Sequence, residues 1–167
     1  MATWQVDLVL VSRAALTAGR GESARVTEHE LEQLSIWEGV NTEDVLARFD
    51  AWLPGRLMTP GWSMFGPEDG NRVDVIFSGA RIEELRVRLD ARHVNGQFLD
   101  RLCQEAQRLN AVLVTSEFHI CEPNVAALVV ELELSEAGQY TFNPEQHLDH
   151  LSRRNDDNGP PPSGDEL

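Results

Sequence analysis

The chain contains no lysine. All 14 of its basic residues are Arg, and 28 Asp and Glu oppose them, which gives a formal net charge of −14 over 167 residues. A charge of this size exceeds the magnitude of about 2–8 that is usual for a small soluble domain. Nucleic acids and acidic membranes both require a basic surface, so the balance predicts neither as a partner and favours a basic protein. Residues 72–116, with 6 acidic residues and 7 Arg, are the exception to the excess.

Cysteine is almost as scarce, with Cys103 and Cys121 as the two thiols. Two cysteines are too few for a disulfide framework, and Cys103 falls on the apolar face of a predicted helix. We therefore expect a buried free thiol at Cys103, a reducing compartment and a cytoplasmic location. The opening residues MATWQVDLVLVS have no basic region and include Asp7, which argues against a signal peptide. No apolar run approaches the roughly 18 residues of a membrane span.

The chain also lacks the common catalytic and cofactor motifs. It has no CxxC, HExxH or GxSxG sequence. Gly19-x-Gly21-x-x-Ala24 matches the spacing of a dinucleotide-binding turn. That motif must follow a strand directly, whereas here Arg13 to Ala18 intervene and the next helix begins only at Thr27. We interpret it as a loop and predict no cofactor.

Two histidine groups are the remaining candidates for chemistry. His119 and Cys121 lie close in sequence with acidic neighbours, and His147 and His150 have helical i, i+3 spacing. Zinc sites use four ligands in paired motifs, which these groups do not form. We interpret them as surface histidines and a loop thiol and predict no metal site or catalytic residue. The alternative is a small metal-dependent enzyme that uses His119 and Cys121.

The first half of the chain predicts a strand and two helices. Trp4 to Ser12 alternates and then becomes apolar, which is typical of a buried strand. A loop is expected from Arg13 to Val26. Thr27 and Glu30 have the spacing of a capping box, which predicts a helix that ends near Gly39. A second helix should begin at Asn41 or Thr42 and end at Pro54-Gly55.

The second half predicts a β-meander followed by mixed elements. Strands are expected at 62–65, 72–78 and 85–92, then a helix over 97–109 and a strand over 111–116. Residues 125–135 fit a helix or a strand, and we favour the helix because Pro123 precedes it. A short helix should begin at Asn143. The fold class is α+β: a mainly antiparallel sheet of four or five strands, with helices on one face, in a single domain over 1–152. The acidic, Pro- and Gly-rich residues 153–167 predict a disordered tail.

From about Gly70 to Leu151 the chain resembles small acidic bacterial α+β proteins of uncharacterised families. The segments that carry the resemblance are GNRVDVIFSG, LRVRLDAR, FLDRLCQEAQRLNAVLV and EPNVAALVVELELSEAGQYTFNPEQHL. Some acidic proteins of this general kind are immunity proteins that neutralise a co-encoded toxin. The resemblance implies a similar fold and a role in inhibition, and it supplies no binding residues.

Two charged surfaces are candidates for binding. Arg86, Arg88 and Arg92 on the central strand are expected to pair across the sheet with Asp74, Glu84 or Asp90, and the alternative is a basic strip that binds an anionic peptide. The other candidate is the acidic face of the first two helices. We predict that it binds a basic partner through Glu28, Glu30, Glu32, Glu38, Glu43, Asp44 and Asp50. The predicted function is a non-catalytic inhibitor of a basic bacterial toxin, of the immunity type. A secretion chaperone or effector adaptor is the alternative in a related class.

Overall fold

A computed structural model describes residues 4–18 and 25–142. The elements follow one another as β1 (Gln5–Ser12), α1 (Arg13–Thr17), α2 (Glu28–Leu34), α3 (Thr42–Asp50), β2 (Gly55–Thr59), β3 (Trp62–Phe65), β4 (Arg72–Ser78), β5 (Arg81–Asp90), α4 (Gly96–Arg108), β6 (Ala111–Thr115), β7 (Ile120–Cys121), α5 (Val125–Leu134) and α6 (Glu136–Phe142). The expected helix from Asn143 and the expected tail lie outside the described residues. Within these residues, none of the helices combines the length and the apolar composition that crossing a bilayer requires.

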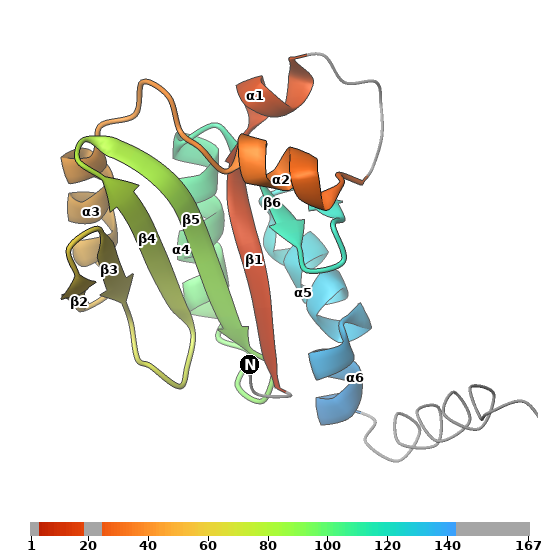
Figure 1. The fold of residues 1–167 in the computed structure, drawn as a ribbon. Helices are drawn as coiled ribbons and strands as arrows, with labels where there is room; N and C mark the ends of the chain where they lie inside the picture. Colours follow the sequence, from red (N-terminus) through yellow and green to blue (C-terminus); the bar gives the residue numbers. More distant parts are fainter. Residues whose placement is uncertain (1–3, 19–24, 143–167) are drawn as a thin grey trace, which may run out of the picture.

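The strands form one antiparallel sheet in the order β2-β3-β4-β5-β1-β6-β7 (Figure 1). The α+β class is confirmed, but the expected four or five strands are seven. The missed strands, β2 and β7, lie at the two edges of the sheet. All residues of β2 except the half-buried Met58 are exposed, and β7 has two residues. Neither segment therefore shows the alternation of apolar and polar residues by which a half-buried strand is recognised in a sequence.

The main core lies between the sheet and three helices. Side chains of alternate strand residues, such as Leu8 on β1 and Val87 on β5, pack with Phe49 of α3, Leu102 of α4 and Leu128 of α5. Figure 1 shows these helices behind the sheet. The face of the sheet that they cover is called the helical face below.

A smaller core lies on the opposite face. There Val11 of β1 and Val112 of β6 pack with Leu31 and Leu34 of α2. In Figure 1 α2 crosses in front of the sheet, so the expectation that all helices share one face is wrong. The reason is that Val9 and Val11 are apolar at the positions that alternate with Leu8 and Leu10, and this end of β1 needs cover on both sides. The face that α2 partly covers is called the open face.

Side-chain caps fix where the helices begin. The capping box of α2 is confirmed, since Thr27 accepts a hydrogen bond from the Glu30 amide and the Glu30 carboxylate accepts one from the Thr27 amide. The side chains of Asn41, Asn95 and Asn124 cap α3, α4 and α5, each by accepting one hydrogen bond from a backbone amide in the first turn. The cap at Asn124 begins the predicted helix over 125–134, which is also confirmed.

Three other boundaries differ from expectation. α2 ends at Leu34, five residues before Gly39, because the Trp37 amide instead donates to the Ile82 carbonyl of β5 and the indole becomes part of the main core. The expected loop after β1 contains α1, and Glu136–Phe142 forms α6. Both helices are short and their sequences show little helical periodicity, so whether they form depends on tertiary packing.

A close approach of backbones at Gly138 gives the first testable prediction. A Cβ at Gly138 would overlap the carbonyl oxygen of Leu132, at the end of α5. Gly138→Ala should therefore lower the free energy of unfolding by about 1–3 kcal/mol in urea denaturation. Gly96→Ala is the matched control, because it has open space around the added methyl group and favours the first turn of α4. Equal stability of the two variants would contradict the packing described for α5 and α6.

Candidate protein-binding surface

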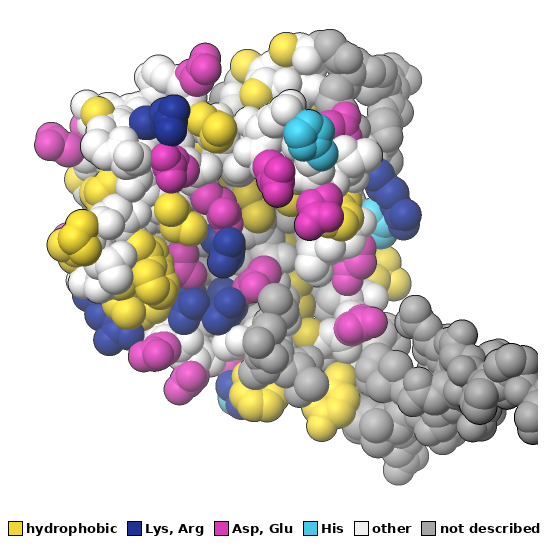
Figure 2. Space-filling model, viewed as in Figure 1, with side chains coloured by type: hydrophobic (Ala, Val, Ile, Leu, Met, Phe, Trp, Pro, Cys, Tyr) yellow, Lys and Arg dark blue, Asp and Glu magenta, His cyan; other side chains and the backbone are white. Residues whose placement is uncertain are grey.

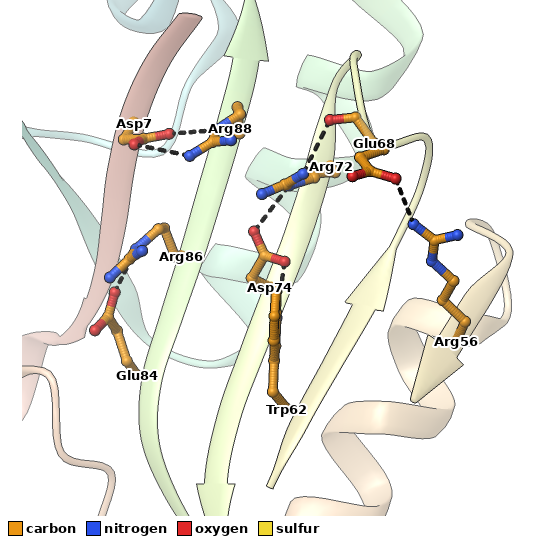
Figure 3. A network of polar contacts seen from close by, with 9 residues as sticks. All are labelled: Asp7, Arg56, Trp62, Glu68, Arg72, Asp74, Glu84, Arg86 and Arg88. Atoms are coloured by element: carbon orange, nitrogen blue, oxygen red, sulfur yellow. Dashed lines mark hydrogen bonds and ion pairs between the residues drawn. The ribbon is translucent and has the colours of Figure 1, made fainter. Parts of the chain in front are cut away.

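The open face carries a layer of ion pairs between α2 and the β2–β3 hairpin. Cross-strand register places Asp7, Arg88 and Arg72 in one row and Arg86 beside Asp74 in the next. Figure 3 shows Arg88 directed toward Asp7, Arg72 toward Asp74 and Arg86 toward Glu84, and Figure 2 shows Arg and acidic side chains interleaved over the middle of this face. Register brings Asp7 and Arg88 together because side chains of neighbouring strands lie directly opposite each other, whereas the other two pairs join residues two apart on one strand.

The most buried of these pairs joins Arg72 to Asp74. The Arg72 Nε lies 3.0 Å from Asp74 Oδ2, and their side chains are 10% and 4% exposed. The indole Nε1 of Trp62 donates to the other oxygen of Asp74 at 3.0 Å, and Arg72 also donates to the Glu68 carbonyl. With these partners both charges are satisfied away from water.

The Arg residues on and just after the central strand β5 also pair with carboxylates. Arg88 donates to Asp7 at 2.8 Å, Arg86 to Glu84 at 2.6 Å and, just after β5, Arg92 to Asp90 at 2.8 Å. The hydrogen bond to Asp7 raises the pKa of Arg88, and the hydrogen bond from Arg92 lowers the pKa of Asp90. Glu84 and Asp90 are partners as predicted, but each lies two residues from its Arg along the chain, so the expected pairing across the sheet is wrong for both. Asp7, the partner of Arg88, and Arg72, the partner of Asp74, were not anticipated.

This pattern extends to most of the basic residues. Among the described residues, nine Arg side chains form ion pairs with carboxylates: Arg13, Arg48, Arg56, Arg72, Arg81, Arg86, Arg88, Arg92 and Arg108. Intramolecular pairing therefore occupies most of the positive charge in this part of the chain. Arg86, Arg88 and Arg92 therefore do not form a strip of unpaired positive charge that could bind an anionic peptide.

The predicted acidic residues lie in the segment that wraps one end of the sheet. α2 lies over the open face, α3 lies on the helical face, and the connection between them passes the start of β5, where Trp37 pairs with Ile82 (Figure 1). The acidic residues thus form a band from one face to the other rather than a single helical face. We call this set the acidic band: Glu28, Glu30, Glu32, Glu38, Glu43, Asp44 and Asp50.

Most of the acidic band is free of intramolecular cations. In the described ranges no Arg forms an ion pair with Glu28, Glu38, Glu43, Asp44 or Asp50, and all five are exposed. Glu30 differs because it caps α2, and Glu32 lies 3.9 Å from the His29 ring. The negative charge of the band is therefore directed to solvent, where it acts on approaching molecules.

The residues of the enzyme alternative do not assemble a ligand set. His119 lies 3.6 Å from Glu131 of α5, while Cys121 is buried in β7. Burial raises the pKa of both Cys121 and Cys103 to about 11, which keeps these thiols protonated at neutral pH. Across 4–18 and 25–142, no three His, Cys, Asp or Glu side chains are grouped so as to hold a metal ion. His147, His150 and the Gly19–Gly21 motif lie outside the described residues.

Comparison of the chain with protein-family models, with curated proteins and with solved structures found no match in any of the three. Function is therefore inferred from geometry and charge.

The buried pair gives a prediction for stability. Asp74→Ala leaves Arg72 without its carboxylate and Trp62 without its acceptor, so the free energy of unfolding should fall by about 3–5 kcal/mol in urea denaturation. Glu68→Ala, which removes the exposed partner of Arg56 at 3.0 Å, is the control and should cost no more than about 1 kcal/mol. Similar losses in the two variants would show that Arg72 and Asp74 are not buried as described.

Asp90 gives a prediction for pH dependence. Its pKa is lowered in the folded protein, chiefly by the hydrogen bond from Arg92, so below neutrality the unfolded chain takes up this proton first. The contribution to stability is complete above the unfolded pKa of about 4 and is lost as the pH falls through the folded value. Asp90→Asn should therefore unfold with a shallower acid dependence below pH 5, measured by denaturation at a series of pH values. Glu117→Gln, which removes one exposed loop carboxylate, is the control for the change in net charge.

Proposed function

We propose that this protein is a non-catalytic binding module for a basic protein partner, and that it acts as an inhibitor of the immunity type toward a basic bacterial toxin. The observation that supports the proposal is the contrast between the two kinds of charge. Nine described Arg side chains are paired within the chain, whereas five exposed carboxylates of the acidic band have no Arg partner there.

An unpaired band of this kind affects association before contact. Like charges concentrated on one end of a molecule attract an oppositely charged partner over about 8–10 Å at physiological ionic strength, and they raise the rate of encounter. The band spans both faces of the sheet end, so it presents carboxylates along a curved rim rather than on a flat patch. In an inhibitor, that rim would meet Lys and Arg around the active site of a toxin and block access to it.

The acidic band destabilises α2, and this loss of stability supports a binding role. Glu28 and Glu32 are four residues apart on α2, and like charges at this spacing destabilise a helix by roughly 0.2–0.5 kcal/mol. Neither residue caps the helix; Glu30 does that. Binding of a basic partner would relieve this repulsion as well as supply attraction.

The experiment is capture of the tagged protein's partner from its native host, followed by kinetics on the purified pair. We expect a basic partner whose association rate falls by about tenfold or more between low and high salt. A band variant that combines Glu28→Gln, Glu32→Gln, Glu38→Gln and Asp44→Asn should lower the rate at low salt by a similar factor. It keeps Glu30, so α2 retains its cap.

The matched control removes the same number of exposed charges elsewhere: Asp69→Asn, Asp100→Asn, Glu117→Gln and Glu133→Gln. It should associate at nearly the rate of the unaltered protein, although both variants have the same net charge. An association rate that is independent of salt, or an equal loss in both variants, would refute the role of the acidic band.

A further inference from the structure

The two edges of the sheet differ in how they are protected. At the β7 edge, Arg25 forms a bridge with His119, and the Val26 amide donates to the Phe118 carbonyl. At the other edge, β2 pairs with β3 on one side and, among the described residues, with no strand on the other (Figure 1). An open edge presents unpaired backbone groups to any extended chain that approaches it.

The register identifies which backbone groups are available. The Gly66 amide donates to the Pro54 carbonyl at 3.0 Å, which makes Arg56 and Met64 the hydrogen-bonded pair of the β2–β3 ladder. The amide and carbonyl groups of Gly55 and Leu57 then point away from β3. Beyond Leu57 a bulge shifts the register, so the regular part of the open edge is short.

A groove runs beside this edge on the helical face. It has a volume of about 260 Å³ and is bounded by α3 and β2, with Leu46 and Ala47 on the helix and Leu57 and Phe65 on the strands. The Leu57 side chain is 66% exposed. The groove therefore has a mixed lining, in which these apolar side chains lie beside Asp50, Arg56 and Ser63, and it is directly adjacent to the unpaired strand groups.

The α3 side of the groove is acidic. Glu43, Leu46, Ala47 and Asp50 have the i, i+3, i+4, i+7 spacing that places side chains along one side of a helix. The Asp50 carboxylate packs close to Gly55, since a Cβ at Gly55 would lie 2.9 Å from its Oδ1. The Asp50 carboxylate of the acidic band therefore lines the groove, and Glu43 lies on the same side of α3 two turns earlier.

We propose that β2 is a docking edge, to which an extended segment of the basic partner adds as a further strand. Backbone hydrogen bonds to Gly55 and Leu57 hold the segment. Side chains on one of its faces enter the groove, where apolar groups contact Leu46 and Leu57 and basic groups reach Glu43 and Asp50. In strand addition of this kind the main chain supplies affinity and pockets for alternate side chains supply specificity. The inference rests on the proposed function for the basic character of the partner and adds how that partner is held.

The probe is a synthetic peptide of two Val-Thr-Lys-Thr repeats, acetylated and amidated, because this order places Val and Lys alternately on one face of a strand and Thr on the other. We expect it to bind the full chain and to slow hydrogen exchange of the Gly55 and Leu57 amides. The same peptide N-methylated at every residue has identical side chains and charge but no backbone donors, and it should bind at least tenfold more weakly. Equal binding of the two peptides would overturn the proposal, because charge alone would then explain the affinity.

Paired variants at one position separate the backbone from the side chain. Leu57→Pro removes an amide that makes no bond to β3, and proline is tolerated on edge strands. Leu57→Ala removes the side chain but keeps that amide. Leu57→Pro should bind the peptide at least tenfold more weakly than Leu57→Ala, while thermal unfolding confirms that both fold. Equal affinities of the two Leu57 variants would refute strand addition.

The charge of the groove is tested separately. Asp50→Asn should also weaken binding of the peptide, with Asp69→Asn as its control.

Two further outcomes separate this proposal from the proposed function and from self-association. If the peptide protects Gly55 and Leu57 but no basic partner is captured at low salt, the docking edge stands and the proposed function fails. If the band variant loses its partner while Leu57→Pro binds that partner as well as Leu57→Ala does, the docking edge fails alone. Protection of these two amides that rises with protein concentration, without peptide, would assign the edge to a second copy and overturn the proposal.

Discussion

The position of β1 between β5 and β6 is the constraint on which the rest of the structure depends. Its pairing places Val6, Leu8 and Leu10 under the helices and Asp7 and Val9 on the open face. A slip of one residue would turn the apolar set toward solvent and bring Asp7 into the core, so burial fixes the register strongly. The same register sets Asp7 opposite Arg88 and Val9 opposite Arg86. The ion pair between Asp7 and Arg88 is therefore a consequence of how the core is packed.

The sheet is covered differently on its two faces. Helices α3, α4 and α5 bury one face, whereas on the other face α2 covers only the end near Val9 and Val11, and ion pairs occupy the middle. Arg72, Arg86 and Arg88, three of the seven Arg in 72–116, are used in this layer. What remains for long-range attraction is the negative charge of the band, which explains how a chain with 14 Arg can still present one sign of charge to a partner.

The acidic band and the docking edge meet at α3. One side of this helix, with Val45 and Phe49, packs into the main core, and its neighbouring side, with Ala47 and Asp50, borders the groove beside β2. A helix that is packed against the core on one side and carries charge on its exposed side can hold a docked segment in a defined place. Long-range attraction by the band and capture at the edge would then act in sequence on the same partner.

The sequence by itself determined the features that depend on neighbours along the chain. The capping box at Thr27 and Glu30, the helix after Asn124, the alternation of the central strands and the excess of acidic charge were all predictable, because hydrogen bonds and periodicity act over a few residues. Only the tertiary structure decided that β2 and β7 are strands, that α2 lies opposite α3, and that Asp7 pairs with Arg88, 81 residues away in the chain. These features depend on which segments meet in space. The exposed residues of β2 carry no pattern of their own, and their strand exists because β3 offers them hydrogen bonds.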